Sequence, residues 1–150
     1  MWKYLRFGYI HWLWTIITVT TLLLDGWWMW GGVVFLVVFG VGGEMLTKNW
    51  RDESNPQYGM PIIHDLIIYS AVVCHFLVLF VMAWTCSSGD LFGFGAWANS
   101  AFANLGITHD VFLARTSNDW IAYVGAAFSV GGVLGVSGIT ASHELTHRTG

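Results

Sequence analysis

The chain has 150 residues, of which 55% are hydrophobic and only 10% are charged. A soluble domain usually carries about 25% charged residues, so this composition indicates an integral membrane protein and excludes an ordinary soluble domain. The formal net charge is −3, and no basic cluster suggests a nucleic-acid partner.

Four apolar runs are long enough for transmembrane helices, which need about 20 apolar residues. They are residues 7–24, 27–43, 62–85 and 120–142. The first ends at the turn dipeptide Asp25–Gly26, and the second opens with Trp27 and Trp28, which fit an interfacial aromatic belt. The first run is not followed by a small-residue cleavage site, so no cleavable signal peptide is expected. The fourth is rich in glycine, which allows close helix approach or a smooth tunnel wall. The predicted fold is all-α, with four transmembrane helices.

Two longer connections differ in character. Residues 44–59 form a polar, turn-forming loop, whereas residues 91–107, inside the long connection 87–119, are uncharged and rich in aromatic residues. We expect that stretch to be re-entrant or to lie at the membrane surface, and we favour the surface.

No disulfide is expected between Cys74 and Cys86, because a helix rises about 1.5 Å per residue and carries them too far apart.

The basic residues predict the orientation, because cytoplasmic ends of spans are enriched in Lys and Arg. With the N-terminus inside, the inner side holds five of them and the outer side only Arg115; the inner ones are Lys3, Arg6, Lys48, Arg51 and Arg148. Both ends of the chain are therefore expected on the cytoplasmic side of an inner or cytoplasmic membrane.

The fourth run ends in the sequence Ser142-His143-Glu144-Leu145-Thr146-His147-Arg148. Residues four apart share one face of a helix, so the imidazoles of His143 and His147 can reach one metal ion. A histidine pair at the mouth of a span is costly to desolvate, which marks it as functional. One interpretation is an intramembrane zinc protease, in which Glu144 of the His-Glu-x-x-His pattern acts as general base.

The same residues resemble the first histidine box of the membrane-bound alkane and xylene hydroxylases, within the wider superfamily of membrane fatty-acid desaturases and hydroxylases. That box ends in Lys or Arg, which Arg148 satisfies and the zinc motif does not require. In this family the box closes the fourth of six spans, and a charged loop with Asn-Pro follows the second, as residues 49–56 do here. The connection 87–119 is longer than is usual for the family.

The resemblance implies O₂-dependent hydroxylation of a hydrophobic chain, such as an alkane, an alkyl-aromatic compound or a fatty acyl group, with desaturation as the near neighbour. It implies two iron ions and a cytoplasmic electron donor, such as rubredoxin or ferredoxin with its reductase. Zinc has no redox chemistry, which favours iron for this reaction. His143 and His147 are then iron ligands, and Glu144 and His64 support them from outside the ligand shell. Residues 1–150 are expected to be the N-terminal part of a single transmembrane domain and to be inactive alone.

The other histidines allow a third interpretation. His64 and His75 lie about three helical turns apart on one face of the third run, and together with His11 they could clamp a haem in a b-type electron-transfer module. In the simpler interpretation His64 lies at the cytoplasmic end beside Asp65, and His75 is a hydrogen-bonded polar residue inside the bundle. His11 and His109 are then interfacial and loop residues.

Overall fold

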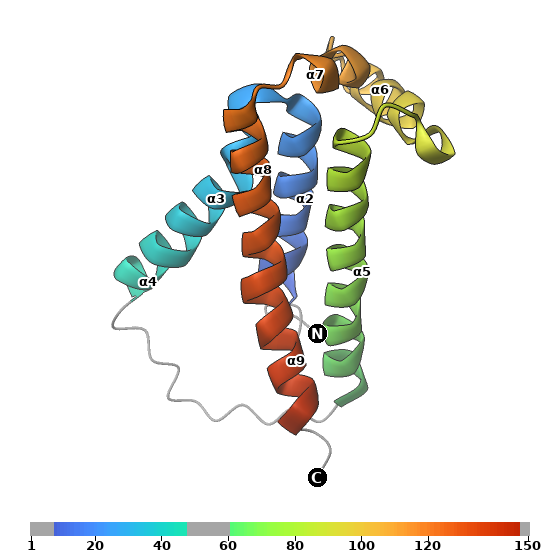
Figure 1. Ribbon diagram of the computed structural model, residues 1–150. Coiled ribbons are helices and arrows are strands. Elements are labelled where there is room, and N and C mark those ends of the chain that lie inside the picture. The colour runs from blue at the N-terminus through green and yellow to red at the C-terminus, as the bar shows by residue number, and fades with distance from the viewer. Residues whose placement is uncertain (1–7, 48–60, 148–150) are drawn as a thin grey trace.

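The structure is a computed structural model that describes residues 8–47 and 61–147, and every regular element in these two ranges is helical (Figure 1). In chain order the elements are α2 (Tyr9–Leu24), η1 (Gly26–Trp30), α3 (Gly31–Phe35), η2 (Leu36–Val41), α4 (Gly42–Thr47), α5 (Pro61–Thr85), η3 (Leu91–Gly93), α6 (Phe94–Asn104), α7 (Val111–Ser117), α8 (Trp120–Gly132), η4 (Val133–Ser137) and α9 (Gly138–His147). η1 and η3 are 3-10 turns, and η2 and η4 are π turns. Most of the polar loop expected at 44–59 lies outside the described residues.

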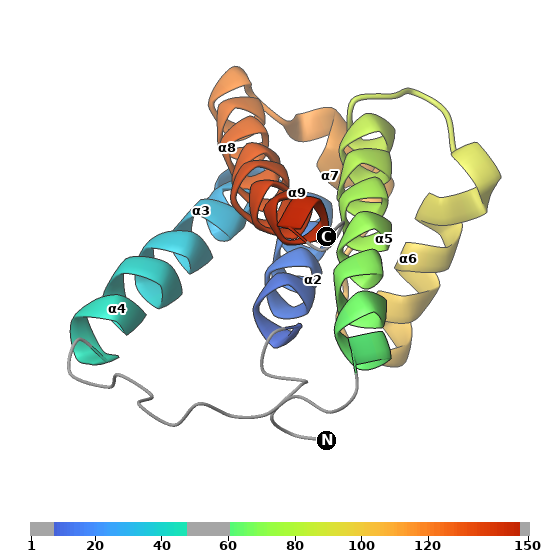
Figure 2. The same cartoon turned by 90° about the horizontal axis from the view of Figure 1, so that it is seen from below.

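Three helical columns stand side by side: α2, α5 and the continuous run of α8, η4 and α9 (Figure 1). The run from η1 to α4 starts against α2 and α8 and then diverges, so that α4 stands apart from the bundle (Figure 2). The start of α5 and the end of α9 lie at one end of the bundle; at the other end α7 packs against α2, and α6 extends outward past α5 (Figures 1 and 2).

A tight turn joins α2 to η1. Asp25 and Gly26 both have positive φ, 74° and 55°, a conformation that glycine adopts readily and other residues rarely. The Ser117 hydroxyl donates to the Asp25 carboxylate at 2.7 Å, and the Gly26 N–H donates to the Asn118 side chain at 3.0 Å. The predicted turn at Asp25–Gly26 is confirmed, and it is held by the connection between α7 and α8.

Two of the four predicted spans reach membrane-spanning length among the described residues. Asp65–Thr85 and Trp120–His143 are long and apolar enough to cross a bilayer, whereas Ile10–Leu24 and Gly26–Val41 are shorter apolar helices. With 16 residues, α2 extends about 24 Å at 1.5 Å per residue, which is less than the roughly 30 Å of a typical hydrocarbon core.

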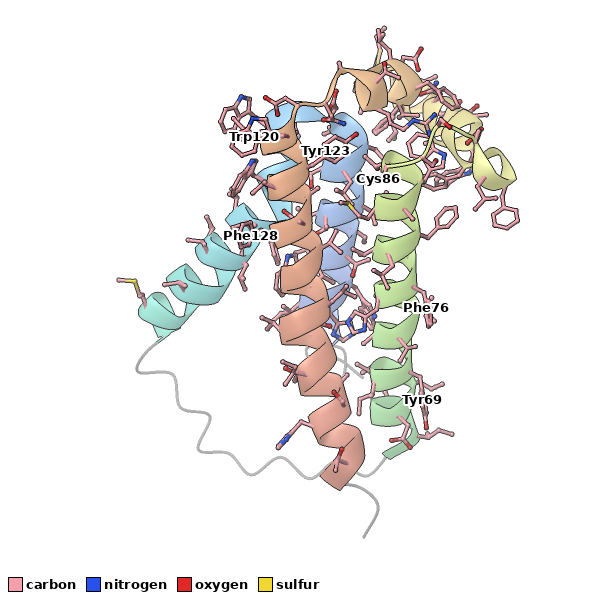
Figure 3. All side chains as sticks on the ribbon, in the orientation of Figure 1. Tyr69, Phe76, Cys86, Trp120, Tyr123 and Phe128 are labelled. Carbon is pink, nitrogen blue, oxygen red and sulfur yellow. The ribbon has the colours of Figure 1, made fainter. Side chains whose placement is uncertain are left out.

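The bundle has apolar side chains both inside and outside. Its core includes Trp14, Met29, Val78 and Val133, all nearly inaccessible to solvent. The outer face of α5 is also apolar: Tyr69 and Phe76 point away from the bundle (Figure 3), as do exposed Leu66 and Val73. Contiguous exposed apolar surface on a soluble monomer is rare, so these faces indicate a membrane environment.

The connection between α5 and α8 folds into a hairpin of two short helices. Asp110 is the N-cap of α7 and accepts from the N–H groups of Phe112 and Leu113. The Asn99 side chain on α6 donates to Asp110 at 3.2 Å and accepts from the Val111 N–H at 2.8 Å. These bonds join α6 to α7, and the hairpin lies at the end of the bundle and outside it rather than between the long helices (Figure 1).

Candidate metal centre

The histidine motif is carried by α9, the last part of the long helix that begins at Trp120. Three glycines let this helix approach its neighbours. A Cβ atom on Gly125 would overlap the Trp30 ring, one on Gly132 would lie 3.0 Å from Trp14, and one on Gly138 would lie 3.3 Å from His75. The close approach expected from the glycine-rich fourth run is therefore confirmed at these positions.

Ser129 anchors the middle of the same helix. Its buried hydroxyl donates to the Met29 carbonyl at 2.7 Å and accepts from the Val33 N–H at 3.2 Å. These two backbone groups lie where the 3-10 turn η1 passes into the α-helix α3. The hydrogen-bond pattern of the backbone changes there, so the two groups do not follow a regular helical pattern. One side chain of α8 therefore satisfies both groups and fixes the helix against α3.

The π turn η4 lies directly before α9 and sets the direction of the motif. A π turn contains one more residue per turn than an α-helix, so everything after it is rotated by about 100° around the helix axis relative to an uninterrupted helix. Such turns occur often at functional sites. The orientation of His143 therefore depends on η4 as well as on the packing of α8.

His143 lies on the outer face of α9. Its side chain is exposed, and it shares this face with Val136 and Ile139, which are 51% and 70% exposed. The helix continues to His147, one turn further, so the backbone places both motif histidines on this face. The side chains of His147, Glu144 and His64, and all of Arg148, lie outside what the structure describes.

The opposite side of the same region holds a separate polar cluster. His75 Nε2 lies 3.1 Å from the Ser137 hydroxyl, which confirms the expected hydrogen-bonded role of His75. His11 on α2 is close enough to interact electrostatically with His75, and its Nε2 atom is buried with no hydrogen-bond partner. His143 comes five positions after Gly138, which packs on His75, so the two faces are about 140° apart.

Two expectations about the remaining histidines can be compared with this geometry. His109 lies in the connection before α7, as expected, and its Nε2–H donates to the Leu23 carbonyl at 2.8 Å. His75 makes the hydrogen bond expected of a polar residue inside the bundle, with Ser137 as its partner, and it packs on Gly138. Ser137 and Ser129 were not predicted as important; the only signal was a hydroxyl within an apolar run.

The donor set in the described part of the chain is small. No group of three or more His, Cys, Asp or Glu side chains that could hold a metal ion occurs among the described residues. A helix with histidines at positions i and i+4 supplies two neutral nitrogen donors, a ligand type that suits iron and zinc alike.

The described residues define a class first: a helical protein in which residues 8–47 and 61–147 contain two helices of membrane-spanning length, with a histidine pair at the end of one of them. Among curated proteins, the chain is similar to Alkane 1-monooxygenase 2 of Pseudomonas aeruginosa, with 28% identity over 153 residues. The alignment covers 95% of the chain and 34% of the relative, so the chain spans about a third of that protein's length. This similarity supports a relationship to alkane monooxygenases and nothing narrower.

Two other comparisons gave no match: no protein-family model matches the chain, and no solved structure matches it.

Proposed function

We propose that this chain is part of a membrane-bound non-haem di-iron monooxygenase that hydroxylates a hydrophobic chain with O₂. The observation that carries the proposal is the histidine pair of α9, at the end of a span-length helix, of which the His143 side chain is exposed. The similarity to an alkane monooxygenase over nearly the whole chain supports the same reaction. A terminal methyl group of an alkane is the first substrate to test, and desaturation of a fatty acyl chain is the nearest alternative.

In this proposal His143 and His147 bind iron through neutral imidazole nitrogens, and the regular helix between them fixes their spacing. Bound iron supplies the redox chemistry that O₂ activation needs and that zinc lacks. Glu144 and His64 orient ligating side chains rather than bind the metal themselves. The apolar outer faces of the bundle keep water away from a hydrophobic substrate that enters sideways from the bilayer.

The proposal also assigns the metal site to the cytoplasmic side, because five of the six basic residues are expected there. On that side a soluble electron donor, such as rubredoxin or ferredoxin with its reductase, can deliver electrons. The proposed second iron and the remaining ligands require residues beyond the histidine pair, since each iron needs about four ligands or more.

The ligand role is tested in the intact protein, expressed in membranes, with His143→Ala and His147→Ala. Each change should remove iron, measured by elemental analysis, and abolish hydroxylated product, measured by gas chromatography. Thr140→Ala is the matched control, because Thr140 is exposed on the same helix and its hydroxyl donates to the Val136 carbonyl of that helix. Full iron content in both histidine variants would refute the ligand assignment.

Glu144→Gln separates iron from zinc chemistry. In a zinc protease Glu144 is the general base, so the change should abolish hydrolysis and leave zinc bound. In the proposed oxygenase it supports a ligand, so iron content or activity should fall about 10- to 100-fold. A wild-type protein that copurifies with zinc, cleaves a membrane peptide and forms no oxygenated product would overturn the oxygenase proposal.

A further inference from the structure

A row of aromatic rings connects α5 to the segment that follows it. The Phe80 ring on α5 stacks on Phe92 with centroids 6.3 Å apart and meets Phe94 edge-on at 5.2 Å. Phe94 in turn contacts Trp97 at 5.7 Å. Because Phe80 belongs to the span-length range Asp65–Thr85, the ring of Phe92 lies at a depth inside that span, not beyond its end.

Phe92 adopts an unfavourable backbone conformation although the described protein covers little of its side chain. Its φ of 60° lies in the left-handed region, which a bulky residue adopts only at an energetic cost. The ring that this conformation directs outward is 88% exposed. Leu91 and Trp97 in the same segment are 56% and 64% exposed, so residues 91–97 carry three large exposed apolar side chains.

Polar groups next to this segment are paired within the protein. Arg115 donates to the carbonyls of Trp84, Ser88 and Gly89 and stacks over the Trp84 ring at 4.4 Å. Asp90 accepts from the Trp84 indole N–H at 3.0 Å and from the N–H groups of Gly95 and Ala96. Backbone groups that approach a bilayer need such internal partners, because hydrocarbon offers none.

From these three observations we propose that the elbow formed by residues 91–97 is embedded in the lipid leaflet opposite the histidine motif. Leu91, Phe92 and Trp97 contact acyl chains just below the headgroups, the level that aromatic side chains favour. The lipid-facing stripe of α5, which includes Tyr69 and Phe76 (Figure 3), thereby continues through Phe80 onto the elbow. The inference rests on the proposal that α5 crosses the membrane.

The test uses single spin-labelled cysteines in the intact protein, with Cys74→Ser and Cys86→Ser as background, in phosphatidylcholine vesicles. Accessibility to oxygen should exceed accessibility to a water-soluble nickel chelate at Phe92→Cys and Trp97→Cys. The reverse is expected at Asn104→Cys, an exposed residue at the far end of the same helix. Phe76→Cys, on the outer face of α5, reports whether that helix lies in lipid.

The outcomes separate the two proposals. Water-type values at 92 and 97, with a lipid-type value at 76, overturn the elbow and leave the membrane assignment intact. A water-type value at 76 overturns the membrane assignment itself. Labels at 92 and 97 that neither reagent reaches would mean that protein covers the elbow, which also overturns the proposal.

A second measurement avoids the cysteine substitutions. The emission of Trp97 is the difference between the wild-type spectrum and that of Trp97→Phe. Lipids brominated near the headgroup end of their chains should quench this emission. Unquenched Trp97 emission would contradict the embedded elbow.

Discussion

Gly125 and Gly131 both lie on α8 but have very different surroundings. A Cβ atom on Gly125 would overlap the Trp30 ring, whereas a Cβ atom on Gly131 would meet nothing within 4 Å. Gly125→Ala should therefore destabilise the protein by about 1–3 kcal/mol, the usual cost of overpacking. Gly131→Ala should be neutral or stabilising by up to about 1 kcal/mol, because alanine favours the helix.

Thermal stability of the two variants in detergent, followed by the loss of the monodisperse peak in size-exclusion chromatography, measures this difference. Equal stability would mean that α8 and η1 do not approach as closely at Trp30 as described.

At the scale of single residues, the sequence predicts the role of a side chain better than it predicts which residue that side chain contacts. A histidine inside an apolar run must find a hydrogen bond, so the role of His75 could be predicted. Its partner, Ser137, lies on another helix 62 residues away, and one sequence contains no signal that pairs the two. The motif histidines are recognisable because their chemistry is local, since both lie on one turn of one helix.

The hairpin of α6 and α7 should loosen in acid. Hydrogen bonds from the Asn99 amide and the Phe112 N–H lower the pKa of Asp110. Desolvation alone would raise the pKa of Asp90, but the Gly95 N–H and the Trp84 indole outweigh it and lower that pKa as well. A carboxyl group whose pKa is lower in the folded state than in the unfolded state stabilises the fold at pH values above its unfolded-state pKa. This stabilisation is lost as the pH falls through the folded-state pKa.

We therefore expect faster amide hydrogen exchange across α6 and α7, after correction for the intrinsic rate, below about pH 4, where unfolded aspartates titrate. The double variant Asp90→Asn and Asp110→Asn is the control, because asparagine also caps helices but does not titrate. Acid loosening that persists in the double variant would assign the effect to other groups.

The π turn η4 gives a second prediction for an element. Deleting Gly135 should turn η4 into a regular α-helix. Gly135 is suited to this test because a Cβ atom at its position would meet nothing within 4 Å. The motif would then rotate by about 100° and move by about 1.5 Å. Iron content should fall, while Gly135→Ala, which keeps the residue count, should retain it. Full iron binding by the deletion variant would show that η4 does not orient the site.

Long apolar runs predicted helices correctly, but not their irregular turns. The structure places α5 at Pro61–Thr85, close to the predicted 62–85, because its ends are marked by polar and turn residues. Neither π turn could be predicted, because a run that is apolar on all sides has no periodicity to interrupt. The capping residues Asp110 and Asp119 are helix-start signals in the sequence, yet the pairing of α6 with α7 depends on Asn99, which carries no such signal.

The proposed orientation of the whole bundle, which rests on the distribution of its basic residues, predicts which loops face the cytoplasm. A membrane-impermeant maleimide should label Thr108→Cys, an exposed residue beside α7, in intact spheroplasts. Lys48→Cys should be labelled only after permeabilisation. Both variants carry Cys74→Ser and Cys86→Ser. The opposite labelling pattern would place the histidine motif outside the cytoplasm and contradict the proposed access of an electron donor.

The unequal helix lengths have a consequence for the lipids around the protein. At 1.5 Å per residue, α5, with 25 residues, measures about 37 Å, whereas α2, with 16, measures about 24 Å. Outward-facing Ile10, Leu13 and Ile16 show that α2 also meets the surroundings of the bundle. A bilayer around this protein would therefore be thinned beside α2 and full-width beside α5, at a cost of a fraction of a kcal/mol per Å of mismatch. Shorter-chain lipids should gather on the thin side, so the protein would sort the lipids around it by chain length.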